Sequence, residues 1–214
     1  MNTEQLRRDE RLSGTLIVIA AFGAIVLMLH HPSSLAPGND GLLLEDWANK
    51  TVHGGMIAFL LLDMFAFTIV ARKLRFSPLC ARAGEMAFTV GMAALVIAGL
   101  INGFALSDLQ AALPDSTVAA LQLRTLWILN QVFALFGVAL VGSAAALWAK
   151  PMLALGRLGR VVAILGIAMA VLAAGWLLLG SGGLSLHAAV GAVAIFALWS
   201  LAIAALLLTG KVRS

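Results

Sequence analysis

The chain has 214 residues, of which 62% are hydrophobic and only 11% charged, with a mean hydropathy of +1.02. No soluble domain of this length needs so many apolar side chains, so most of the chain is expected to lie in lipid. The net charge of +4 does not indicate nucleic-acid binding, because the basic residues lie in short loops beside apolar stretches. The single cysteine, Cys80, excludes an internal disulfide and a cysteine zinc motif.

Six apolar stretches are each long enough to cross a membrane. A hydrocarbon core of about 30 Å takes roughly 20 helical residues. In lipid each backbone polar group must be paired inside its own segment, so these stretches are expected to be helices. The sequence therefore predicts an all-α polytopic membrane helix bundle that forms a single integral membrane domain over residues 1–214. In chain order its helices are expected at about 12–29, 52–71, 85–106, 125–148, 159–180 and 184–208.

Proline and glycine mark the joints between these stretches, and Pro151 follows the fourth of them. Two connecting segments, 33–49 and 107–123, are long enough to hold a short surface-lying helix. The alternative is an ordinary connector whose leucines dip into the interface. The first stretch is interpreted as a membrane helix and not as a cleaved signal peptide, because its apolar run of about 18 residues exceeds a usual signal-peptide core.

The basic residues are distributed unequally between the two sides of the predicted bundle. One side carries 12 lysines and arginines, whereas the other carries only Lys50 and Arg124. Because cytoplasmic loops are enriched in basic residues, this pattern predicts that both termini are cytoplasmic and that the protein is a multi-pass protein of a bacterial-type inner membrane. Trp47 and Trp127 are expected at the outer interface and Trp148 at the inner one, as an aromatic belt.

All four histidines fall near the outer ends of these helices: His30 and His31 end the first, His53 begins the second and His187 begins the sixth. A neutral imidazole can ligate a metal ion or haem iron, and it can also carry a proton near neutral pH. Two or three such rings that converge at one depth from different helices suit a haem or a divalent metal ion. His53 and His187 are therefore the predicted ligand pair, with His30 or His31 as a third ligand. The alternative is that these histidines only face the interface or pack between helices.

Three side-chain amides share the outer third of the bundle with the histidines. They belong to Asn102 in the third stretch and to Asn130 and Gln131 in the fourth. Polar groups inside a bilayer need a partner or a function. We expect these amides to orient the imidazole ligands or a bound substrate.

Asp63 lies near the middle of the second stretch, among leucines and methionine. A carboxylate at that depth must be neutralised by a proton or paired with a donor, and no lysine or arginine is expected at the same depth. Ten residues separate it from His53, which is about 15 Å along a helix and roughly 80° around it. The two side chains are therefore expected to line one broad cavity without touching. Asp63 is either a proton carrier or a protonated acid that bonds to a neighbouring helix.

These features leave three functions open. The first is a redox or metal-handling protein that binds haem or a divalent metal ion in the outer pocket. The second is a small proton-coupled transporter that uses Asp63. The third is a non-catalytic membrane assembly subunit, whose polar residues bind other membrane subunits. All three have the lipid bilayer as a partner and none involves nucleic acid. The sequence identifies no catalytic residue, so it does not decide whether the protein is an enzyme.

Overall fold

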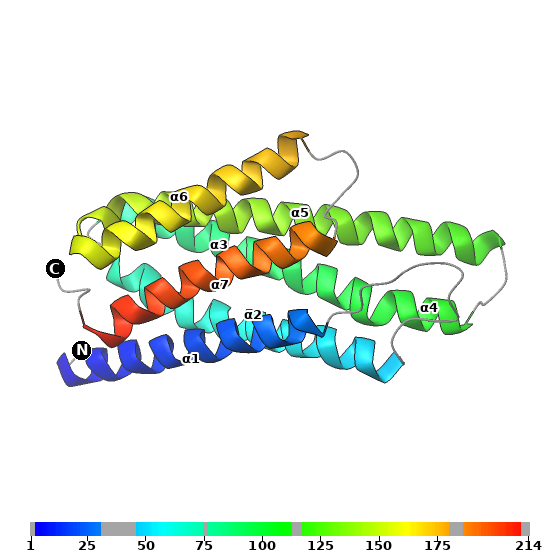
Figure 1. The fold of residues 1–214 in the computed structure, drawn as a ribbon, viewed down its shortest axis with the longest axis horizontal. Helices are drawn as coiled ribbons and strands as arrows, with labels where there is room; N and C mark the ends of the chain where they lie inside the picture. Colours follow the sequence, from blue (N-terminus) through cyan, green and yellow to red (C-terminus); the bar gives the residue numbers. More distant parts are fainter. Residues whose placement is uncertain (1–2, 31–45, 75–76, 113–116, 180–185, 211–214) are drawn as a thin grey trace.

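The computed structural model describes residues 3–30, 46–74, 77–112, 117–179 and 186–210. These residues form a bundle of long helices, and the first and last of the described residues lie at the same end of the bundle (Figure 1). We call that end the inner end and the opposite end the outer end. Six helical rods are long and apolar enough to cross a membrane. The helices are α1 (Thr3–Leu29), α2 (Asp46–Lys73), α3 (Pro78–Leu100), η1 (Ile101–Ala105), α4 (Leu106–Ala112), α5 (Thr117–Leu153), α6 (Gly156–Leu179) and α7 (Leu186–Leu208).

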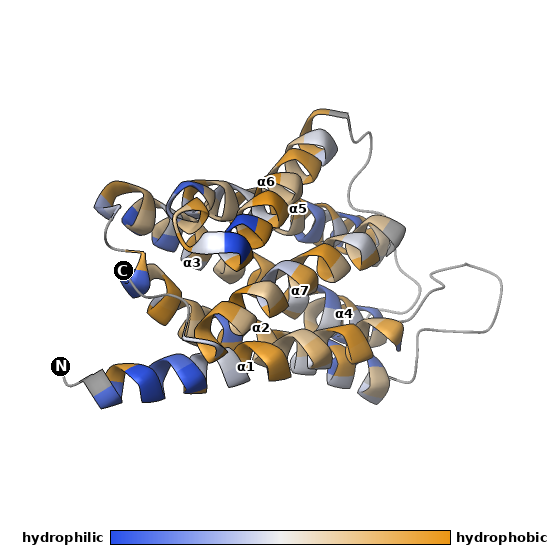
Figure 2. Ribbon diagram, turned by 60° about the vertical axis from the view of Figure 1, so that its left-hand side comes forward, coloured by the Kyte–Doolittle hydropathy of each residue, from blue (hydrophilic) through white to orange (hydrophobic). Residues whose placement is uncertain are grey.

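The expected all-α class and the six membrane-length helices are confirmed. The helices other than α7 are longer than hydropathy indicates, because the helical backbone continues into residues beyond each apolar run. Figure 2 shows this for the first turns of α1, which are hydrophilic, while most of each helix is apolar. Pro151 does not end its helix at once, since α5 continues to Leu153.

The third rod runs without a break through α3, η1 and α4, from Pro78 to Ala112. Its middle piece, η1, is a π-helix of five residues. Residues 107–112 thus extend this rod, and residues 117–123 belong to α5. The expectation of a separate surface-lying helix over 107–123 is therefore wrong. The equivalent expectation for 33–49 falls mostly outside the described residues.

The helices pack as two groups joined along α2 and α3. On one side α1 lies against α2 and α7, and on the other α5 lies against α3 and α6. The contact between α6 and α7 is smaller, and Figure 1 shows α6 diverging from the other helices towards the outer end. A methyl group added at Gly175 in α6 or Gly191 in α7 would meet no atom within 4 Å, in agreement with open space there.

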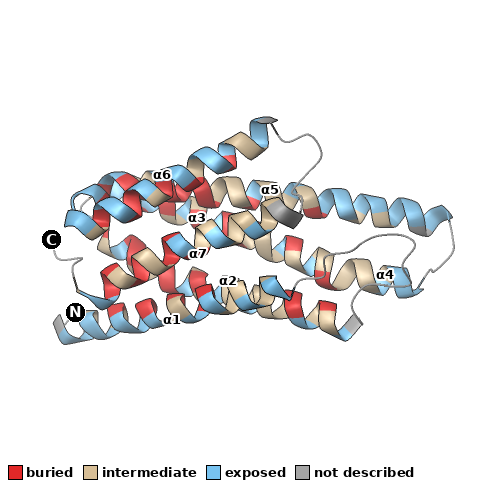
Figure 3. Ribbon diagram, in the orientation of Figure 1, coloured by how far each residue is buried: buried red, intermediate tan, exposed pale blue. Residues whose placement is uncertain are grey.

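Buried residues concentrate in the inner half of the bundle (Figure 3). Their centre is a cluster of five aromatic rings whose neighbouring centroids lie 4.5 to 6.5 Å apart. Such stacked and tilted pairs stabilise a core beyond the area that they bury. We call this set the aromatic cluster; it consists of Phe67, Phe88, Trp148, Phe196 and Trp199.

The placement of Trp148 corrects the sequence expectation of an inner interfacial belt. The side chain is fully buried, and its Nε1 donates a hydrogen bond to the Ala81 carbonyl at 3.2 Å. It lies over Gly84, where an added methyl group would come within 2.3 Å of the indole nitrogen. Trp47 and Trp127, by contrast, are 65% and 43% exposed. An indole can satisfy its N–H inside the protein as well as at an interface, and hydropathy does not distinguish the two.

Candidate functional site

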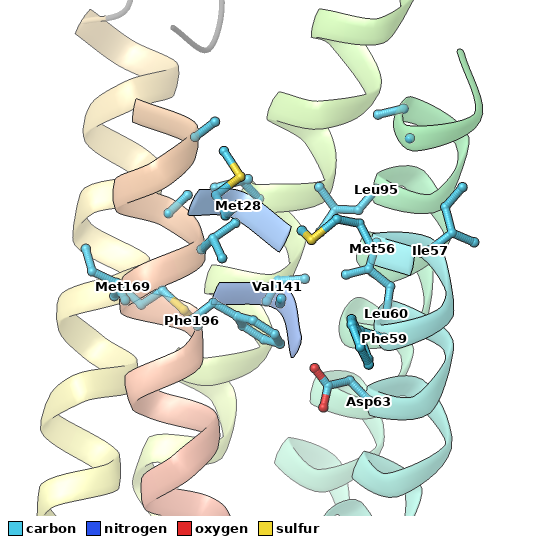
Figure 4. Close-up of a pocket in the computed structure, with 18 of the residues that line it drawn as sticks. Met28, Met56, Ile57, Phe59, Leu60, Asp63, Leu95, Val141, Met169 and Phe196 are labelled. Carbon is cyan, nitrogen blue, oxygen red and sulfur yellow. The ribbon is translucent and has the colours of Figure 1, made fainter. Parts of the chain in front are cut away.

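A central cavity of about 230 Å³ lies between the helices in the outer half of the bundle. All six membrane-length rods contribute to its lining through α1, α2, α3, α5, α6 and α7. Most of the wall is apolar, with three methionines and two phenylalanines among the lining residues (Figure 4). Of the described residues that line it, only His53 and Asp63 have a titratable side chain. The expectation that these two residues line one cavity is confirmed.

Asp63 lies at the inner end of this cavity, on α2. Figure 4 shows its carboxyl group beside the ring of Phe59, with Phe196 across the cavity. The residue is only 3% exposed, and its Oδ1 has no hydrogen-bond partner. No lysine or arginine is among the described residues of the lining. An ionised carboxylate in such surroundings is costly, so this group holds either a proton or a cation.

His53 lies at the outer end of the cavity, one helical turn into the buried part of α2. Both of its ring nitrogens are hydrogen bonded. Nδ1 contacts the Asn49 carbonyl at 2.9 Å, and Nε2 contacts the Asn102 side-chain amide nitrogen at 3.0 Å. A carbonyl only accepts, so Nδ1 carries a proton and donates it to Asn49, while Nε2 pairs with the side chain of Asn102.

The π-turn in the third rod makes this contact feasible. Gly103 lies in η1, and a methyl group there would come within 2.3 Å of the His53 Cβ. Only glycine therefore lets α2 approach so closely. Asn49 completes the contact, since its Nδ2 donates to Ser107 Oγ at 2.9 Å and to the Gly103 carbonyl at 3.3 Å. A π-turn inserts one extra residue into a helix, and such turns occur often at functional sites.

Gly99 and Gly103 are four residues apart, and both permit a close helix crossing. The partner is α2, because an added methyl group at Gly99 would come within 3.1 Å of Ile57. Asn49 and the π-turn were missed by the sequence analysis. The available signal was the Asn102–Gly103 dipeptide, which usually marks a turn and here interrupts an apolar helix.

The other histidines do not join His53 within the described part of the chain. His30 is exposed, and its Nδ1 bonds to the Val26 carbonyl of its own helix at 2.8 Å. His31 lies outside the described residues, as does the side chain of His187, whose backbone belongs to α7. The described residues contain no group of three histidine, cysteine, aspartate or glutamate side chains that could hold a metal ion.

Binding of haem or a divalent metal ion stays a prediction, because His31 and the side chain of His187 lie outside the described residues. Among the described residues that line the cavity, His53 is the one with an imidazole, and its Nε2 contacts the side-chain amide of Asn102. Asn102 does contact His53, as expected of a residue that orients the ring. Asn130 is buried on α5 and Gln131 is half-buried beside it, but neither is among the lining residues of the cavity.

No family model, no curated protein and no solved structure matches this chain. Its function must therefore be inferred from the cavity itself.

Proposed function

We propose that the protein is a small proton-coupled transporter of lipophilic cations, and that Asp63 binds a proton and the cation alternately. The observation that carries the proposal is a buried carboxyl oxygen without a partner, Oδ1 of Asp63, at the end of an otherwise apolar cavity. The substrate class follows from the surroundings of that group, and the coupling follows from its charge.

The cavity walls suit a small organic cation better than a metal ion or a polar solute. A metal ion that loses its water on binding needs several oxygen ligands from the protein. Among its described residues, the lining offers only the carboxyl group of Asp63 and is otherwise mostly hydrocarbon. The rings of Phe59 and Phe196 lie near the carboxyl group (Figure 4), and aromatic rings attract cations. Met28 and Met56 add adaptable, polarisable contacts. At about 230 Å³ the cavity is smaller than the roughly 300 Å³ of a small drug site.

Coupling to protons follows from the cost of a bare carboxylate in apolar surroundings. Without substrate the carboxyl group holds a proton; a bound cation neutralises it instead. One proton therefore leaves Asp63 for each monovalent cation that binds, and the charge inside the cavity stays the same. At the outer end His53, held by Asn102, provides the polar mouth of the cavity.

The test is proton release from purified protein in weakly buffered detergent solution. Tetraalkylammonium ions of increasing chain length are added, and the released protons are counted with a pH indicator. We expect about one proton per bound cation, with binding lost above the chain length that fills the cavity, and neither release nor binding in Asp63→Asn.

The matched control is Asp108→Asn. This carboxylate lies outside the cavity, is 66% exposed and pairs with Lys50 at 2.7 Å. It should leave cation binding and proton release unchanged. If wild-type protein binds no cation, or if Asp63→Asn binds and releases protons normally, the transporter proposal is wrong.

A cofactor role is the second candidate, because His53 lines the cavity and α7 supplies Ala189, two residues after His187, to the same wall. In this alternative both imidazoles would bind haem or a metal ion, with Asn102 released from His53. An absorption spectrum and a metal analysis of the purified protein test it. A Soret band or a stoichiometric metal that is lost in His53→Ala and in His187→Ala would favour this role over transport.

We further propose that both termini face the cytoplasm of a bacterial-type inner membrane, since basic residues gather at the inner end. Cys80 is the single cysteine, and it lies two residues after the start of α3 at that end. A membrane-impermeant thiol reagent should label Cys80 only after the membrane is permeabilised. The control Cys80→Ala/Asp108→Cys moves the thiol to the outer end and should be labelled in intact cells. The opposite pattern would reverse the orientation.

A further inference from the structure

We infer that Ser200, Ser13 and Glu10 form a proton route between Asp63 and the inner surface, along the seam where α1 meets α2 and α7. The inference rests on the proposed role of Asp63 as the proton site. It adds the direction of proton exchange and the residues that carry it.

The buried polar side chains are not scattered through the bundle. Of those that the structure describes, all except Asn130 lie on α1, α2 or α7, the helices that form this seam. From the outer to the inner end they are Asn49 and His53, then Asp63 and Ser200 at about one depth, and then Ser13 and Glu10. A buried polar group in lipid is costly without a partner or a function, so a row of them across the membrane needs an explanation.

The register between α1 and α2 fixes the depth of Asp63. Leu27 lies over Gly55 and Phe59 lies over Gly23, as their short contacts show. At the inner end Glu10 forms an ion pair with Lys73. These three contacts share one antiparallel register, because the paired residue numbers add to nearly the same value. In that register Asp63 lies opposite the turn of α1 that contains Ala20.

The register between α1 and α7 brings Ser200 to the same turn. Leu208 and Ala204 both lie against Gly14 of α1. Ser200 is one helical turn before Ala204 on the same face of α7, and so faces α1 further towards the outer end. The two helices are antiparallel neighbours, so Ser200 also lies within about one turn of Ala20.

Asp63 and Ser200 therefore approach one turn of α1 from two neighbouring helices. Ala20 and Ala21 in that turn are fully buried and small, so α2 and α7 can both come close. Ser200 has no exposed surface, and its Oγ has no hydrogen-bond partner, as is also true of Asp63 Oδ1. Two such atoms at one depth are the partners that a bridging water molecule needs.

The buried face of α1 continues the row to the inner surface. Glu10, Ser13, Ile17 and Ala20 recur at intervals of three or four residues, so they share one face of the helix. Ser13 is 2% exposed and Glu10 is 7% exposed. Ten residues separate Glu10 from Ala20, which is about 15 Å along the helix axis.

The chemistry of transfer is a simple exchange of protons. A hydroxyl group accepts a proton on its oxygen and donates its own, so Ser200 and Ser13 remain neutral. A proton that leaves Asp63 passes through these hydroxyls and intervening water to the Glu10 carboxylate, and from there to water at the inner surface. Lys73 is partly exposed beside Glu10 and offsets its charge. Other charged groups near Glu10 are Arg7 and Arg11, which border a small cleft with it.

Ile17 is the apolar layer that interrupts this row. It is fully buried between Ser13 and the turn at Ala20. It keeps the hydroxyl of Ser13 apart from the group formed by Asp63 and Ser200, so the route conducts only when water passes this side chain. A hydroxyl placed at position 17 should therefore create a proton leak even without any cation substrate.

The test compares Ile17→Thr with Ile17→Val in proteoliposomes. Both variants have nearly the same shape, but only threonine adds a hydroxyl group. A potassium gradient with valinomycin drives protons, and a trapped pH indicator records the flux. We expect Ile17→Thr to conduct at least about tenfold faster than Ile17→Val, in line with the effect of a positioned proton-transfer group. Adding Asp63→Asn or Glu10→Gln to Ile17→Thr should remove the leak.

A matched control is Val162→Thr, which places a hydroxyl at a fully buried position of α6, away from the seam; it should not leak. Equal fluxes in Ile17→Thr and Ile17→Val, or a leak that survives Asp63→Asn, would overturn the route. If Ile17→Thr does not fold, wild-type protein and Ser200→Ala are compared instead. In that comparison the pH at the inner surface is changed suddenly, and the infrared carbonyl band of Asp63 records how fast the group takes up a proton. The rate in Ser200→Ala should be about tenfold lower than in wild-type protein. Equal rates in the two proteins would overturn the route.

The two proposals can fail separately. A leak that depends on Asp63, together with absent cation-linked proton release, would keep the route and reject the transport of cations. Cation-linked release without any leak in Ile17→Thr would keep the transporter and reject the route.

Discussion

The outer and inner halves of this bundle belong to the same six membrane-length rods, yet they are packed in different ways. The inner half is closed by the aromatic cluster, and small residues such as Gly84 let its rings interlock. The outer half holds a cavity, a π-turn and a helix, α6, that diverges from its neighbours (Figure 1). Polar contacts, such as that between His53 and Asn102, replace ring packing there.

This difference indicates a division of tasks. Close packing resists change, because well-filled interiors tolerate little displacement. The inner half can therefore hold the helices together while the outer half opens or closes around a bound molecule. Asp63 lies at the boundary between the halves, where the cavity ends and Phe67, one turn further along α2, begins the aromatic cluster.

The largest expected effect comes from removing a ring of the inner half. Trp148→Ala should lower the free energy of unfolding by about 3–5 kcal/mol, because a large cavity would replace stacked rings. Thermal unfolding in a mild detergent measures it. Trp127→Ala is the control, since that side chain is 43% exposed at the outer half, and it should change stability by much less. Equal losses in both variants would contradict the proposed division.

Replacing an alanine with leucine distinguishes the packing of the two halves more sharply. Ala144→Leu places a larger side chain at a fully buried inner position, and overpacking there should cost about 1–3 kcal/mol. Ala192→Leu adds the same side chain to the wall of the outer cavity. It should therefore leave the unfolding temperature nearly unchanged, because the cavity has room for it, and it should abolish binding of the tetraalkylammonium ions. Normal binding in Ala192→Leu would show that the ligand site lies elsewhere.

The π-turn offers a test inside the outer half. Gly103→Ala should separate α2 from η1 and weaken the contact of His53 with Asn102, because the new methyl group would meet the His53 Cβ. We expect a cost of about 1–3 kcal/mol and weaker cation binding. Gly175→Ala meets no atom within 4 Å on α6, so it should be neutral or slightly stabilising. Circular dichroism melts and binding titrations compare the two.

The smallest effect should come from the ion pair on the outer surface. Lys50 and Asp108 lie 2.7 Å apart, but their side chains are 31% and 66% exposed. Exposed pairs contribute about 0–1 kcal/mol, so Lys50→Gln should scarcely change the melting temperature. Raising the salt concentration should reduce even that difference. A loss comparable to that of Gly103→Ala would mean that this pair fixes the position of α4 more firmly than its exposure indicates.

The sequence by itself determined the number of membrane-length helices and the depth of each polar residue. Both follow from local quantities, namely the length of an apolar run and the rise of 1.5 Å per helical residue. For the same reason the shared cavity of His53 and Asp63 was predicted correctly, since both lie on one helix.

The tertiary structure alone decided which helices are neighbours and how closely they approach. It brought Asn102 to His53, and it buried Trp148 in the aromatic cluster. Apolar periodicity in lipid does not specify lateral partners, because lipid chains and neighbouring helices are similarly apolar. Glycine contacts and a single π-turn specify them instead, and their effect depends on the opposing helix.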